Sequence, residues 1–189
     1  MKTKGFNSYM PKSDQDKDMR EAMAPLCLEL GQALYICQCF EDSLCFLLSL
    51  VSHEKANGED DAFRAAWDFH SKKTVSNLLK LLRERIDVPS ELDGYLGVGV
   101  EKRNEIVHGF LTKNQNVQRW MTPKGRLEVE EELTMLKLEV KRRDIVVNKW
   151  LDALLEKYGI SNQMLKDNAG KLWDLLNPDA RSASSSSTH

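Results

Sequence analysis

The sequence predicts an all-α protein, an antiparallel helical bundle with one small β-hairpin inserted. Hydrophobic residues make up 41% of the 189-residue chain and charged residues 30%, and the longest apolar patterns repeat every three or four residues. Glycine and proline, with 10 and 5 residues, are too sparse to punctuate an all-β fold. The length suits one domain with a single buried core.

The first apolar pattern begins at Pro25. Residues 1–19 are polar and charged without an apolar period, and we expect them to form a flexible arm. Regularly spaced apolar residues from 26 to 51 then predict a long amphipathic helix. Because its most apolar run, from Leu44 to Val51, is too short to span a bilayer, we expect a core helix and no membrane segment.

All four cysteines, Cys27, Cys37, Cys39 and Cys45, fall on this predicted helix. Residues along one helix do not easily reach the geometry of a disulfide, so unbridged, buried thiols are the favoured interpretation. A metal site is the alternative, but the spacing lacks the paired ligands and nearby histidine of typical zinc sites. We therefore expect no bound metal and no cofactor.

Two further helices are expected on either side of Pro89. Apolar positions between residues 63 and 86 carry a helical period up to this break, and the next helix should cover residues 91–111. Three glycines in its first half each disfavour a helix by roughly 0.5–1 kcal/mol relative to alanine. They indicate either close packing against another backbone or a helix that begins only at Val100; they are Gly94, Gly97 and Gly99.

Residues 117–130 carry the only strand pattern in the chain. Two short stretches flank Thr122-Pro123-Lys124-Gly125, whose composition is typical of a turn, and together they predict a β-hairpin. Helices should follow, and the helical domain is expected to cover residues 20–177. The serine-rich residues 178–189 are expected to be a disordered tail.

The segment that carries chemistry is Arg103-Asn104-Glu105-Ile106-Val107-His108. On a helix, Asn104 and His108 are four residues apart and share a face, which Arg103 borders. The apolar side chains of Ile106, Val107 and Phe110 point elsewhere and can anchor the helix in the core.

Such a trio suits cleavage of RNA without a metal. An imidazole ordinarily titrates near neutral pH, so His108 can take the proton of a ribose 2′-hydroxyl or give one to the leaving 5′-oxygen. The guanidinium of Arg103 can hold two phosphate oxygens and stabilise their growing charge, and Asn104 would orient the imidazole or the phosphate. A histidine without such neighbours would by default be interpreted as structural. The presence of Arg103 and Asn104 beside His108 favours a catalytic role.

Any contact with nucleic acid must be local, because the net charge is only −2. The basic residues concentrate around the motif, and we expect Lys102, Lys113 and Arg119 to bind RNA. One motif supplies only one histidine, whereas acid and base act on opposite sides of the phosphorus. A two-fold homodimer with the motif at its interface would supply both groups.

Residues 103–110, Arg-Asn-Glu-Ile-Val-His-Gly-Phe, resemble the motif of the HEPN family (higher eukaryote and prokaryote nucleotide-binding), and the resemblance covers about residues 25–158. The resemblance implies a helical bundle that dimerises around the motif and acts as a metal-independent endoribonuclease, in a toxin or phage-defence setting with a possible antitoxin or other regulatory partner. It also implies a supporting acidic residue on an early helix, for which Glu41 is the candidate. Some antitoxin-paired members carry a modifiable tyrosine where this chain has Phe110.

Members of that family that have lost catalysis keep an alternative open. In it, Arg103 and His108 belong to a non-catalytic helical module that binds a nucleotide or a protein. The chain opens on Met1-Lys2-Thr3-Lys4 and a charged run in place of a secretory signal, so we expect a cytoplasmic protein.

Overall fold

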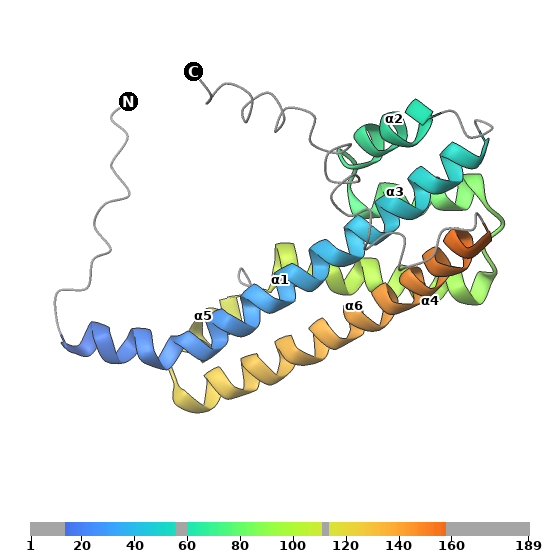
Figure 1. Cartoon of the computed structure of the whole chain (residues 1–189). Coiled ribbons are helices and arrows are strands. Elements are labelled where there is room, and N and C mark those ends of the chain that lie inside the picture. The colour runs from blue at the N-terminus through green and yellow to red at the C-terminus, as the bar shows by residue number, and fades with distance from the viewer. Residues whose placement is uncertain (1–13, 56–59, 111–113, 158–189) are drawn as a thin grey trace, which may run out of the picture. The chain divides into compact units, whose positions relative to one another are not determined.

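The computed structural model describes residues 14–55, 60–110 and 114–157, and every regular element within these ranges is a helix (Figure 1). The all-α prediction is confirmed for this part of the chain. The predicted tail and most of the predicted arm lie outside the described residues. The elements are α1 (Asp14–Lys55), α2 (Asp60–His70), α3 (Val75–Arg85), α4 (Ser90–Asn104), the π-helical turn η1 (Glu105–Gly109), α5 (Asn114–Trp120) and α6 (Pro123–Lys157).

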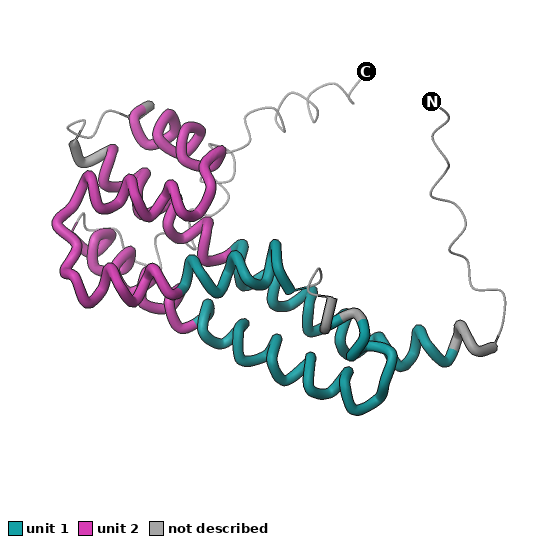
Figure 2. The backbone as a smooth tube through the Cα atoms, turned by 180° about the vertical axis from the view of Figure 1, so that it is seen from behind, with its two compact units in different colours: residues 1–38, 99–141 teal, residues 39–98, 142–189 magenta. Residues whose placement is uncertain are grey.

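The chain divides into two compact units (Figure 2). Unit 1 comprises residues 1–38 and 99–141, and unit 2 comprises residues 39–98 and 142–189. The first half of α1, the end of α4, η1, α5 and the first half of α6 therefore belong to unit 1, which contains the whole Arg-Asn-His motif.

The helices α1 and α6 are parallel neighbours, whereas the sequence analysis expected an antiparallel bundle. In unit 1, Glu29 accepts hydrogen bonds from Thr134 at 2.6 Å and Lys137 at 2.5 Å, and in unit 2, Ser43 donates to Asp144 at 2.7 Å. From the first of these contacts to the second, both helices advance toward their C-terminal ends, and the ribbons of α1 and α6 run in the same direction (Figure 1). Parallel packing is possible because the 67 residues between α1 and α6, from 56 to 122, can cross back before α6 begins.

The Glu29 carboxylate carries a negative charge at the contact between α1 and α6 in unit 1. Burial alone would raise the pKa of Glu29, but the hydrogen bonds from Lys137 and Thr134 and the positive charge of Lys137 outweigh that effect. The pKa of Glu29 is therefore below its usual value, and the carboxylate stays charged where α1 meets α6.

The arm expected over residues 1–19 overlaps the first helix, because α1 begins at Asp14 and contains Pro25. Asp18, Met19 and Arg20 are exposed. These first turns bury little, so no apolar period marks them in the sequence. Pro25 is exposed too, and its missing N–H removes one helical hydrogen bond from the turn before it.

By length and composition alone, the segment Asp18–Ser52 of α1 is apolar enough to cross a membrane. The prediction of no membrane segment rests on uninterrupted apolar residues alone, and polar residues interrupt this segment. Half of the most apolar 18-residue window is buried inside the protein, and Phe40, Leu44 and Leu47 are fully buried. A core helix has this pattern, and a signal sequence near an N-terminus passes the same test of length and composition.

The predicted β-hairpin over residues 117–130 is wrong, because these residues belong to α5 and α6 apart from the two that join them. Thr122 and Pro123 are the start of a helix: the Thr122 hydroxyl accepts a hydrogen bond from the Gly125 N–H at 3.1 Å, and Pro123 occupies the first helical position. A Cβ at Gly125 would collide with the Arg119 carbonyl, so this glycine permits the close approach of α5 and α6.

The glycines of α4 do not break the helix. It runs unbroken from Ser90 to Asn104, and a Cβ on Gly94 or Gly97 would meet nothing within 4 Å. The start at Val100 is therefore wrong, and these two glycines make no room for another backbone of this chain; close approach of a second subunit stays a prediction.

None of the four cysteines forms a disulfide, as predicted. Cys37 and Cys45 are buried, whereas Cys27 is exposed, and the described residues contain no group of side chains arranged to hold a metal ion. Burial, followed by the negative charge of Asp42, raises the pKa of Cys45 to about 11, so its thiol is uncharged and unreactive at neutral pH.

In unit 2, His70 is buried at the end of α2, with 1% of its surface exposed. Its Nε2 lies 3.4 Å from an Arg85 guanidinium nitrogen and 3.5 Å from the Ser52 hydroxyl, and its Nδ1 has no hydrogen-bond partner among the described residues. Burial, and then the positive charges of Arg85 and Lys73, hold the pKa of His70 below its usual value. The folded protein therefore keeps this imidazole neutral.

Folding stability is accordingly expected to fall in mild acid. Above the ordinary histidine pKa of about 6.5, His70 is neutral in both states and contributes no pH dependence. Below it, the unfolded chain takes up a proton that the folded chain resists, so the free energy of unfolding decreases as the pH falls. Denaturant unfolding at about pH 7.5 and 5.5 should show a smaller decrease for His70→Gln than for the wild-type chain, and equal decreases would contradict this assignment.

Candidate functional site

The motif residues lie where α4 changes into a π-helical turn. In a regular α-helix, two residues five positions apart point about 140° away from each other, at 100° per residue. The wider π turn instead brings residues i and i+5 close to one line along the helix. Residues Glu105–Gly109 form such a turn, and Arg103 and His108 are five positions apart.

As a result, the side chains of Arg103 and His108 meet. A guanidinium nitrogen, Nη1, lies 3.2 Å from Nε2 of His108 and 3.0 Å from the side-chain oxygen of Asn104. A guanidinium only donates, so in this contact Nε2 is the acceptor and the ring proton resides on Nδ1. Arg103, predicted only to border the face shared by Asn104 and His108, thus contacts both of these side chains.

The trio differs in accessibility in a way that suits a ligand. His108 is exposed, and Arg103 and Asn104 are half-buried. An imidazole at the surface can reach an incoming molecule, while a guanidinium held from one side keeps a defined direction.

Two apolar side chains anchor the π turn in the core of unit 1. Ile106 is 1% exposed and Phe110, which follows the turn, is fully buried, as the sequence predicted. Val107, expected to share this role, is only half-buried.

A polar chain that the sequence analysis missed holds the end of the turn. Asn116 of α5 is buried, and its side-chain amide donates to the Phe110 carbonyl at 2.8 Å. The Asn116 oxygen accepts from Arg119 at 3.1 Å, and Arg119 donates to Glu132 of α6 at 2.8 Å. The three side chains thus connect the motif backbone to α6. A single asparagine in a short polar stretch carries no sequence signal for this role.

Replacing Asn116 with alanine is expected to reduce the free energy of unfolding by about 1–3 kcal/mol, because it leaves the buried Phe110 carbonyl without its donor. Denaturant unfolding would measure the change. Asn77→Ala is the matched control, since this exposed asparagine uses only its backbone N–H in the cap of α3. A loss at Asn116 no larger than the loss at Asn77 would show that the carbonyl bond contributes nothing.

Two of the three predicted RNA-binding residues form ion pairs within the chain. Lys102 forms an ion pair with Glu105 at 3.1 Å, one turn along the motif helix. Arg119 contacts Glu132 at 2.8 Å and Glu128 at 3.7 Å, so its described contacts join α5 to α6. Lys113 lies outside the described residues.

Glu41, the predicted supporting acid, lies on the part of α1 that belongs to unit 2, whereas the motif belongs to unit 1. It is half-buried, and its negative charge, after the effect of burial, contributes to raising the pKa of its neighbour Asp42. Its support of the motif stays a prediction.

No family model, curated protein or solved structure matches this chain.

Proposed function

We propose that the chain is a metal-independent endoribonuclease of the HEPN type. The observation that supports this most is the contact between Arg103 and His108, which the π turn holds at 3.2 Å. A cationic donor next to an accessible imidazole is the pair that phosphodiester cleavage needs, and π turns are frequent at functional sites.

In the proposed reaction, the ribose 2′-hydroxyl attacks the adjacent phosphorus and loses its proton to a base. The bond from phosphorus to the 5′-oxygen breaks, and that oxygen takes up a proton. The products are a 2′,3′-cyclic phosphate and a 5′-hydroxyl. His108 performs one of the two proton transfers, and Arg103 stabilises the charge on the phosphate oxygens. Asn104 holds the guanidinium in place through its bond at 3.0 Å.

The second proton transfer requires a second group, and a two-fold homodimer around the motif would provide the partner's His108. The remaining parts of the proposal rest on the sequence and on the resemblance. They are the helical-bundle arrangement, a cytoplasmic toxin or phage-defence role, RNA contacts by Lys102, Lys113 and Arg119, and control by an antitoxin or another regulatory protein.

A non-catalytic module that binds a nucleotide or protein is the second candidate. It is favoured by the same nitrogen of Arg103 contacting both Asn104 and His108, because such a contact also ties side chains together without chemistry.

The chemistry of the products tests the proposal. The full chain is incubated with a structured RNA and a chelator, and the fragment ends are analysed. Fragments with 2′,3′-cyclic phosphate and 5′-hydroxyl ends are expected. Fragments with 3′-hydroxyl ends, or RNA left uncut with any regulatory protein removed, would count against it.

A further inference from the structure

One face of α6 exposes large apolar side chains. Leu127, Met135, Leu138 and Ile145 are between 38% and 62% exposed, and at 100° per residue they lie within an arc of about 80°. The opposite face of the same unbroken helix is buried; its fully buried side chains are Val129, Leu133, Val140 and Val147. An apolar stripe on the outer face of a helix is a candidate interaction surface.

We propose that this outer face of α6, residues 127–145, binds the same face of a second copy of the chain, with the two helices antiparallel about a two-fold axis. The inference does not depend on ribonuclease activity, and the contact is separate from the motif-centred pairing proposed above. With the axis between residues 136 and 137, Met135 lies opposite the partner's Leu138, and Leu127 lies next to the partner's Ile145.

The charges along the face favour this register. Glu131 lies as far before the axis as Arg142 lies after it, so each meets the partner's residue of opposite sign. Glu130 and Lys141, at one edge of the stripe, match in the same way to within two residues. A parallel pairing would instead place like charges together, so the pattern selects the antiparallel one.

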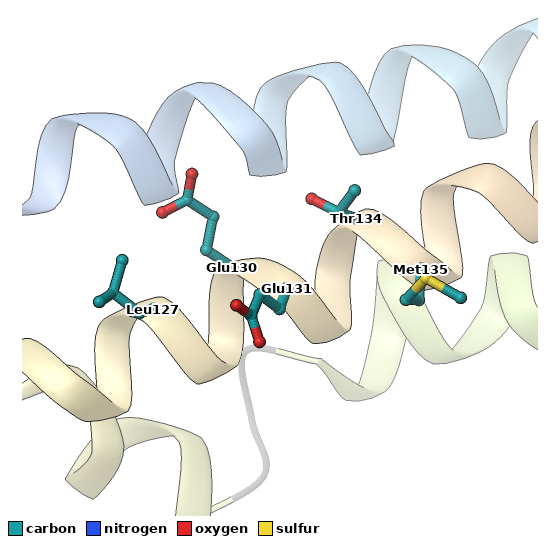
Figure 3. Close-up of a pocket in the computed structure, with 5 residues that line it drawn as sticks. All are labelled: Leu127, Glu130, Glu131, Thr134 and Met135. Carbon is teal, nitrogen blue, oxygen red and sulfur yellow. The ribbon is translucent and has the colours of Figure 1, made fainter.

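A groove in unit 1 provides the receiving surface. It has a volume of about 520 Å³ and is lined by α6 residues, with Leu127 and Met135 toward its two ends and Glu131 between them (Figure 3). In the proposed register, the partner's Leu138 and the partner's Arg142 face this groove. The partner's apolar side chain therefore meets the apolar wall of the groove, and the partner's cation meets a carboxylate.

A second copy fits this face better than nucleic acid does. The carboxylates of Glu130 and Glu131 line the groove and would repel phosphates. A partner must therefore offer apolar side chains followed by a cation at helical spacing, and the outer face of α6 itself has this sequence of groups.

The test is the mass of the full chain in solution, by analytical ultracentrifugation at about 100 µM, where contacts of micromolar affinity are populated. At least twice the mass of the 21.6 kDa chain is expected, since motif-centred pairing would add to it. Glu131→Arg and Arg142→Glu should each weaken association at least about tenfold, because like charges then face each other. The double variant should restore it.

Rescue by the double variant is informative because residues 131 and 142 are about 16 Å apart along one helix and cannot pair within a chain. Leu138→Gln should also weaken association without a change of charge, and circular dichroism checks that each variant is folded. A monomeric wild-type chain, which leaves the face to a basic peptide or to residues 158–189, would overturn the proposal. So would a double variant as weak as the single ones, or a dimer that responds only to substitutions at Arg103 and His108.

Discussion

Replacing His108 with alanine is expected to slow RNA cleavage by at least about a hundredfold, since a positioned acid or base usually contributes a factor of about 10² to 10⁴. The side chain is exposed, so its removal should leave the fold intact. Single-turnover cleavage of a labelled RNA in chelator would measure the rate. Glu101→Gln is the matched control, because Glu101 is an exposed residue on the same helix close to the motif.

The Arg103 variants complete this prediction. Arg103→Ala should be as slow as His108→Ala, and Arg103→Lys should recover little, because a lysine cannot span two phosphate oxygens with a planar group. Since the two side chains touch, the double variant should be about as slow as the slower single one. Cleavage at the wild-type rate by folded His108→Ala protein would exclude the imidazole from the chemistry. Losses that multiply would show that the two groups act independently.

Replacing Phe110 with alanine is expected to reduce the free energy of unfolding by about 3–5 kcal/mol, the usual result of emptying the space of a buried phenylalanine. Phe110 is fully buried directly after the π turn, and its carbonyl is held by Asn116. Chemical denaturation of the two proteins would measure the difference.

Phe69→Ala provides the comparison for that experiment. Phe69 is about half exposed, and its ring contacts the Lys73 ammonium at 4.2 Å, so about 1 kcal/mol or less is expected. If the two variants lost similar stability, the π turn would not depend on its apolar anchor.

The helical class could be predicted from the sequence because apolar spacing follows the helical repeat along α1, α3 and α6. The ends of the helices could not. The first turns of α1 have no buried face, and Thr122-Pro123 has the same composition whether it forms a turn or begins a helix. The predicted hairpin over residues 117–130 is wrong for this reason, because Thr122-Pro123 begins a helix. The parallel pairing of α1 and α6 depends on contacts between distant residues, which local patterns do not encode.

The candidate site was predicted in its residues but not in its geometry. Arg103, Asn104 and His108 stood out by their chemical types, and the structure brings them together. Regular helical geometry did not predict the contact between Arg103 and His108, five positions apart, since nothing in five residues distinguishes a π turn from an α turn. Asn116 was missed because its role depends on the Phe110 carbonyl. Every residue has a backbone carbonyl, so the sequence does not indicate which of them needs a side-chain donor.

The π turn amounts to one extra residue inserted in a helix, and this has a consequence for changes of chain length. Deleting Val107 would restore ordinary winding and leave the arginine and the imidazole four positions apart, which in an α-helix still aligns them. Phe110, two residues after the imidazole, would keep its direction toward the core as well, because a π turn takes up an extra residue without turning the residues that follow it. A chain shortened by this one residue is therefore expected to keep both the aligned pair and the buried anchor.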